Sequence, residues 1–136
     1  MRRMLVVALF GAALGCKQHA GNSAQPAVAG AAPTSNDPRA ALFLQKGCPQ
    51  CHSISAFGVK STTEVGPDLT YAYADVRNRF SESLEQFLPN PTGTMQMVLT
   101  QLIHLTPEER DSVIHILKRL HDERAASGDT LRRESP

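Results

Sequence analysis

The chain has 136 residues, a formal net charge of +1 and a hydrophobic fraction of 41%. So small a net charge argues against nucleic acid or an anionic membrane surface as the main partner. The length allows one small domain with additional segments. Aromatic residues make up only 5% of the chain and tryptophan is absent, so large side chains for a hydrophobic core are few.

Residues 1–15 are typical of an N-terminal signal peptide. Arg2 and Arg3 give the segment a positive start. The apolar run 4–14 that follows is too short to cross a bilayer as a helix. We therefore expect this segment to direct the chain out of the cytoplasm.

Residues 13–16 read Ala-Leu-Gly-Cys, which is similar to the cleavage site of a bacterial lipoprotein. Cys16 would then become the lipidated first residue of the mature chain. Leucine is favoured three residues before the cysteine, where alanine stands here. The alternative is ordinary cleavage after Gly15 or Ala20, which would release a soluble protein.

Residues 16–36 are predicted to form a flexible tether. They are rich in Ala, Gly, Pro, Ser and Gln and lack a usable periodicity. About 20 such residues span roughly 25 Å on average. A tether of this reach would let a folded domain swing clear of lipid headgroups.

The folded part is expected to begin at Asp37-Pro38, a good N-cap followed by a residue suited to the first helical position. An apolar-patterned helix follows as far as Lys46, and Gly47 is a fitting helix end. The predicted helix therefore leads directly into Cys48.

Residues 48–52 read Cys-Pro-Gln-Cys-His, which is the C-x-x-C-H attachment signal of a c-type haem. The thiols of Cys48 and Cys51, about one helical turn apart, can add across the two vinyl groups of one porphyrin. The adjacent imidazole of His52 would lie over the iron as its proximal axial ligand. The chain has few aromatic side chains to fill a core. One covalent haem c would fill much of that space.

Two other functions of paired cysteines fit less well. A thioredoxin-like C-x-x-C needs a strand–helix setting, which the surrounding pattern lacks. A zinc site needs a second ligand pair. The chain has His104, His115 and His121 but no second pair of cysteines. Haem attachment would use two of the three cysteines, and lipid would account for Cys16.

Residues 66–69 read Gly-Pro-Asp-Leu and follow the motif after a polar loop predicted over residues 53–64. This order resembles that of class I cytochromes c, in which a Gly-Pro-x-Leu segment follows the haem motif. The resemblance implies that the carbonyl of Pro67 accepts a hydrogen bond from the second ring nitrogen of His52. Such a bond fixes the tautomer and strengthens the imidazole as a ligand. Gly-Pro alone would indicate only a turn.

Two short helices are predicted next, over residues 71–80 and 81–88. Class I cytochromes c often have an arginine just before the second of these helices that binds a haem propionate. Arg79 falls near that place, and its guanidinium suits a carboxylate. Arg77 is a rival, and a solvated arginine with no such role is an equally open alternative.

Residues 90–97 read Asn-Pro-Thr-Gly-Thr-Met-Gln-Met. In class I cytochromes c an Asn-Pro is followed shortly by the methionine that is the distal iron ligand, which makes Met95 or Met97 the candidate. We favour Met95, because Gly-Thr-Met resembles the family's turn before the ligand. In an extended backbone the two side chains would point to opposite sides. His104 is a rival ligand, and two gap-filling core methionines are the other alternative.

The last predicted helix begins at Thr106, which forms a capping box with Glu109, has Pro107 at its first position and runs to about Glu123. It should cross the first helix through one apolar stripe, made of Val113, Ile114, Leu117 and Leu120. The family usually has an aromatic residue on this helix where Ile116 stands. His115 and His121 lie off the stripe and are predicted to be surface residues.

The resemblance covers residues 37–124 and implies an all-α cytochrome c fold of three or more helices around one haem. A disordered tail is expected over residues 125–136. With histidine and methionine on its two sides, the iron would have no open position for a substrate. The chain is therefore expected to carry single electrons and not to be an enzyme. Its expected partners are a quinol-oxidising complex and a terminal oxidase or reductase, in the periplasm or at the outer face of the cytoplasmic membrane.

Two alternative functions stay open at this point. The domain could be a docked haem relay subunit of a larger respiratory complex, which the polar tether disfavours. It could also be a haem enzyme or sensor with an open iron, which would require that neither Met95 nor Met97 binds the metal.

Overall fold

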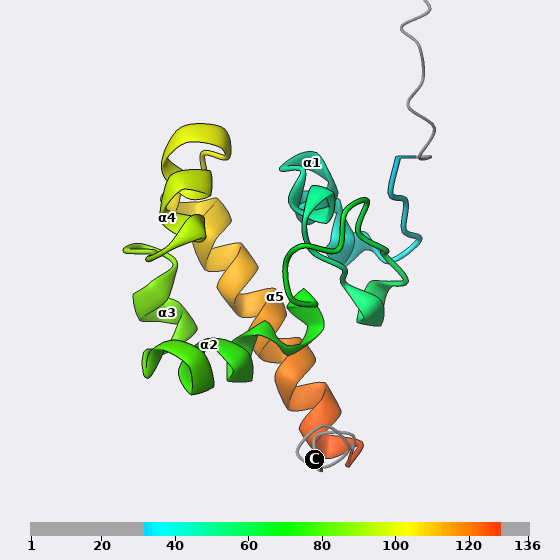
Figure 1. The fold of residues 1–136 in the computed structure, drawn as a ribbon. Coiled ribbons are helices and arrows are strands. Elements are labelled where there is room, and N and C mark those ends of the chain that lie inside the picture. The colour runs from blue at the N-terminus through cyan, green and yellow to red at the C-terminus, as the bar shows by residue number, and fades with distance from the viewer. Residues whose placement is uncertain (1–31, 129–136) are drawn as a thin grey trace, which may run out of the picture.

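The computed structural model describes residues 32–128, and this part of the chain is mostly helical (Figure 1). Its α-helices are α1 (Ala41–Gln45), α2 (Ala72–Phe80), α3 (Leu84–Phe87), α4 (Thr94–Met97) and α5 (Pro107–Ala126). Short 3₁₀ turns cover Pro38–Ala40, Cys48–Gln50, Ser55–Phe57 and Leu69–Tyr71, and a π-helical turn covers Val98–Leu102. The predicted all-α class is confirmed for the described residues.

No helix between residues 32 and 128 combines the length and the apolar character needed to span a membrane. The predicted signal peptide 1–15, the lipidation candidate Cys16 and most of the predicted tether 16–36 lie outside the described residues, as does the chain from residue 129 onward.

The start of the folded part follows the predicted helix signals. The side chain of Asp37 accepts a hydrogen bond from the backbone N–H of Arg39 at 2.9 Å, and Pro38 occupies the first turn. Gly47 ends the segment with a φ of +74°, a left-handed conformation that glycine adopts without steric cost. Cys48 follows at once, as the sequence predicts.

Helix α5 begins with the predicted capping box. The hydroxyl of Thr106 accepts from the N–H of Glu109, and the Glu109 carboxylate accepts from the N–H of Thr106 at 2.9 Å. The helix continues to Ala126, beyond the predicted end at Glu123. The predicted boundary of the disordered tail at residue 125 is therefore wrong, because the last helical turn includes the first residues assigned to that tail.

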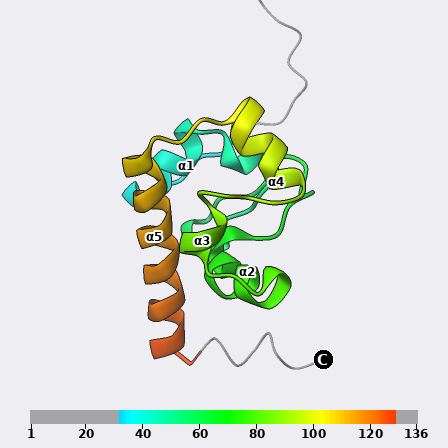
Figure 2. The same ribbon diagram turned by 90° about the vertical axis from the view of Figure 1, so that its left-hand side faces the viewer.

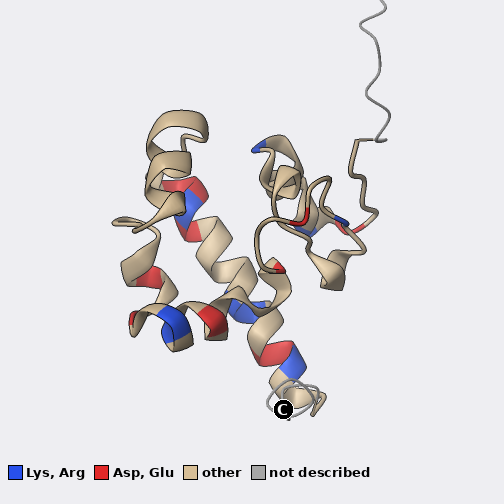
Figure 3. Ribbon diagram, in the orientation of Figure 1, with Lys and Arg blue, Asp and Glu red and all other residues tan. Residues whose placement is uncertain are grey.

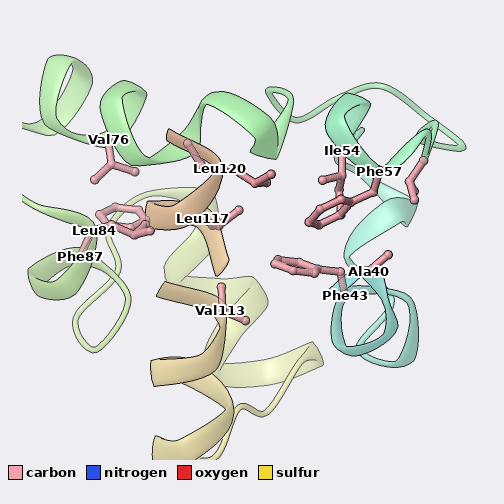
Figure 4. Packing of buried hydrophobic residues seen from close by; sticks show 12 residues of the cluster. Ala40, Phe43, Ile54, Phe57, Val76, Leu84, Phe87, Val113, Leu117 and Leu120 are labelled. Carbon is pink, nitrogen blue, oxygen red and sulfur yellow. The ribbon is translucent and has the colours of Figure 1, made fainter. Parts of the chain in front are cut away.

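The hydrophobic core lies on both sides of α5. Leu117 sits at its centre, with Phe43 on one side and Phe87 on the other (Figure 4). Of the predicted stripe, Val113, Leu117 and Leu120 are buried and Ile114 is partly buried. The buried hydrophobic residues are Ala40, Phe43, Ile54, Phe57, Val59, Ala72, Val76, Leu84, Phe87, Val113, Leu117 and Leu120.

Two ion pairs join the N-terminal segment to α5, which runs along one side of the other helices (Figure 2). Lys46 contacts Glu109 at 2.6 Å near the start of α5, and Arg39 contacts Glu123 at 3.0 Å near its end. The predicted contact between the first and last helices is present. Ion pairs that water reaches contribute little to stability, so these two serve mainly to orient the N-terminal segment against α5.

Two local predictions need correction. The loop over residues 53–64 is not simply polar, because Ile54 and Val59 pair through an isolated β-bridge and are almost fully buried. The second short helix is only Leu84–Phe87 and is capped by Ser83, whereas Ser81 ends α2 in a left-handed conformation at φ +59°.

Candidate functional site

The cysteine motif folds as a tight helical turn. The backbone N–H groups of Cys51 and His52 both donate to the carbonyl of Cys48, at 3.2 and 3.0 Å. Pro49 is buried in the first turn, where its missing N–H costs nothing. Both thiols are free and half-buried. The turn therefore presents two thiols and one imidazole from five consecutive residues.

The ring of His52 is held by the segment that follows the loop. Its Nδ1 lies 2.7 Å from the carbonyl oxygen of Pro67. Since a carbonyl can only accept, Nδ1 carries the proton and the lone pair of the neutral ring lies on Nε2. The hydrogen bond that the resemblance implied is present. It leaves the imidazole in the tautomer that a metal ligand requires, and metal binding by His52 stays a prediction.

Gly66 packs directly against the same ring. A Cβ atom at this position would lie 2.4 Å from Cε1 and 2.5 Å from Nδ1 of His52. The N–H of Gly66 also donates to the carbonyl of Cys51 at 2.8 Å. The sequence indicated Gly66 only as part of a turn, and its steric role could not be anticipated from the Gly-Pro pair.

The two candidate methionines lie on α4, which follows Gly93. The backbone of residues 94–97 is helical, so the case of an extended backbone does not apply here. Two positions apart on a helix are still separated by about 200° around the axis, so the side chains diverge as predicted. Met95 is half-buried and packs against the core, whereas Met97 is 58% exposed. Of the two, Met95 is the one turned toward the interior.

Arg79 is an exposed residue of α2. Its guanidinium lies 4.0 Å from the carboxylate of Asp75, one turn earlier on the same helix. Charges of both signs are mixed along α2 and α5 (Figure 3). Arg77 is exposed as well. The structure places neither arginine against the motif, so propionate binding by Arg79 stays a prediction and the solvated alternative fits its surroundings.

The histidines outside the motif have other neighbours. His115 is exposed as predicted, but His121 is half-buried and its ring lies 5.3 Å from that of Tyr73, so the prediction of a plain surface residue is wrong for His121. The backbone carbonyl of His104 accepts from Lys46. Within residues 32–128, no three side chains of His, Cys, Asp or Glu gather as a metal-binding group.

Burial makes the Cys48 thiol a poor nucleophile in the folded chain before haem is attached. It raises the pKa of this thiol from 9.0 to about 11. At pH 8 the reactive thiolate is then about 100-fold scarcer than in the unfolded chain. We expect iodoacetamide to alkylate Cys48 about 100-fold more slowly in the haem-free folded protein than in urea, as measured by peptide mass spectrometry. Equal rates in the two conditions would contradict the burial of this thiol.

No protein-family model, no curated protein and no solved structure matches the chain. The chemistry of the site therefore has to be inferred from its own geometry. Two free thiols on one turn fit covalent attachment of a porphyrin, and an imidazole with a free Nε2 fits an axial ligand. Gly66 leaves room for the ring in this orientation. The residues present thus fit a c-type haem.

Proposed function

We propose that the protein is a mono-haem c-type cytochrome that carries single electrons. Cys48 and Cys51 would hold the haem covalently, and His52 would be its proximal ligand. The observation that carries the proposal is the hydrogen bond between His52 Nδ1 and the carbonyl of Pro67. His52 directly follows Cys51, the second of the two free cysteines. A haem iron supplies reversible one-electron chemistry.

Met95 is proposed as the distal ligand. Its half-buried side chain and its contact with the core support this role over Met97, which is largely exposed. A thioether is a soft ligand that favours reduced iron and raises the potential. With both axial positions filled, the protein would transfer electrons without binding a substrate at the metal.

We further propose that the protein acts outside the cytoplasm, tethered by lipid at Cys16, between a quinol-oxidising complex and a terminal oxidase or reductase. The signal-like residues 1–15 and the single cysteine left after haem attachment support this location. In detergent-free fractionation, a Cys16→Ser variant should no longer be found in the membrane fraction and should appear in the soluble fraction. Unchanged membrane association of that variant would remove the lipid anchor from the proposal.

The axial ligands can be tested by absorption spectroscopy of the purified protein. The oxidised wild type should show the near-infrared band of a sulfur–iron bond. Met95→Ala should lose this band and Met97→Ala should keep it, which makes Met97 the matched control. The reduced wild type should not bind carbon monoxide at neutral pH. Binding by the wild type would instead indicate an open iron, and with it an enzyme or a sensor.

A further inference from the structure

The loop that precedes Pro67 is fastened to the cysteine motif by its own backbone and hydroxyl groups. The N–H of Thr62 donates to the carbonyl of Pro49 at 3.0 Å. The hydroxyls of Thr62 and Thr63 both donate to the carbonyl of Gln50, at 3.0 and 2.5 Å. Ser61 adds a longer contact to the same oxygen, at 3.4 Å. We call Ser61, Thr62 and Thr63 the hydroxyl clamp.

The clamp satisfies carbonyls that the motif cannot satisfy itself. A 3₁₀ turn as short as Cys48–Gln50 leaves its last carbonyl groups without partners inside the turn. Water would ordinarily bind such groups at a surface. Here the carbonyl of Gln50 accepts from three hydroxyls, more than its two lone pairs need. So many donors on one oxygen indicate that this part of the motif is held in a fixed position.

Ser61, the first residue of the clamp, is held in place by further hydrogen bonds. Ser61 is buried, its N–H donates to the hydroxyl of Ser53 at 2.9 Å, and its own hydroxyl accepts from the N–H groups of Thr63 and Glu64. Glu64 then adopts a φ of +54°, a left-handed conformation that is costly for a residue with a Cβ. Such strain persists only where the surrounding contacts enforce it.

The same segment reaches His52 at its other end. Two and three residues beyond Glu64, Gly66 lies against the imidazole and Pro67 accepts its Nδ1–H at 2.7 Å. The segment 61–67 therefore contacts the motif at two places, the carbonyl of Gln50 and the ring of His52. A shift at the first contact would move the second, because only Glu64 and Val65 lie between Thr63 and Gly66.

We propose that Thr62 and Thr63 are positioning residues that set the donor strength of His52. They fix the loop so that the carbonyl of Pro67 stays close to Nδ1, which increases the electron density at Nε2. A stronger imidazole donor favours oxidised iron over reduced iron and so lowers the reduction potential. This inference rests on the proposed haem function and adds to it the residues that tune the proximal ligand.

The test compares the reduction potentials of purified, haem-loaded variants by spectroelectrochemical titration. Replacing both Thr62 and Thr63 by valine keeps the side-chain volume and removes both hydroxyls, so the potential should shift upward. Replacing both by serine restores the hydroxyls and should return the potential to that of the wild type. Ser112→Ala removes a hydroxyl bond to a backbone carbonyl on α5 and should leave the potential unchanged.

Each outcome decides a different point. If the double valine variant does not fold, the reduction potentials of the single Thr62→Val and Thr63→Val variants are compared with that of the wild type instead. A lower unfolding midpoint with an unchanged potential in the valine variants would overturn the positioning role and leave only a structural one. Equal potentials for the valine and serine variants would overturn it too. A wild type without covalent haem would instead refute the proposed function on which the inference rests.

Discussion

A Gly66→Ala variant is expected to displace the ring of His52 and to break its hydrogen bond with Pro67. The added Cβ would lie 2.4 Å from Cε1, far inside van der Waals contact, so the imidazole or the loop must move. Overpacking of this kind costs about 1–3 kcal/mol. In the haem-loaded protein the reduction potential should rise and the fraction of reduced protein that binds carbon monoxide should increase. Equilibrium unfolding measures the loss of stability, spectroelectrochemical titration the potential, and carbon monoxide titration the binding.

Gly58→Ala is the matched control for this variant. Gly58 has a φ of +67° and no atom within 4 Å of a Cβ added there. Alanine in the left-handed region costs about 1–2 kcal/mol, so the loss of stability should be similar in size. The potential and the carbon monoxide binding should stay those of the wild type. If both variants alter the haem spectrum equally, the steric contact of Gly66 with His52 has no special role.

The Phe43→Ala variant is expected to lose about 3–5 kcal/mol of unfolding free energy, the cost of removing a buried aromatic side chain. Phe43 is 1% exposed, and its ring centroid lies 6.3 Å from that of Phe57. It fastens α1, the helix that leads into the motif, to the core beside Leu117 (Figure 4). The total free energy of unfolding of a native protein is only about 5–15 kcal/mol, so this variant should be close to unfolding.

Phe80→Ala provides the comparison for that measurement. Phe80 is 44% exposed and stacks on Phe87 with a centroid distance of 4.8 Å. Losing one partly exposed aromatic contact should cost about 1 kcal/mol. Chemical denaturation of both variants under the same conditions gives the two values. A loss of stability from Phe80→Ala as large as that from Phe43→Ala would contradict the larger contribution expected of the buried Phe43.

Features set by local chemistry could be predicted from the sequence. Asp37, Gly47 and the Thr106 capping box each depend on the conformational preference of a few neighbouring residues, and all three are present. The contact between His52 and Pro67 was also expected, although through a resemblance. What these predictions share is a short sequence signal with one strongly preferred geometry.

Features that depend on contacts between distant residues could not be predicted in this way. The clamp of Thr62 and Thr63 on Gln50 joins two segments through hydroxyls that read as ordinary polar loop residues. The contact of His121 with Tyr73 joins α5 to α2, and helical periodicity alone gave no reason to expect it. The π-helical turn Val98–Leu102 has no sequence signature of its own.

The intact mass of the protein, purified from a host with haem-ligation machinery, tests the central proposal most directly. The proposal predicts a coloured protein whose chain carries the added mass of one haem, retained after denaturation and lost when Cys48 and Cys51 are replaced by serine. A colourless protein with the mass of the polypeptide alone, purified from a host that loads a known c-type cytochrome in parallel, would contradict it.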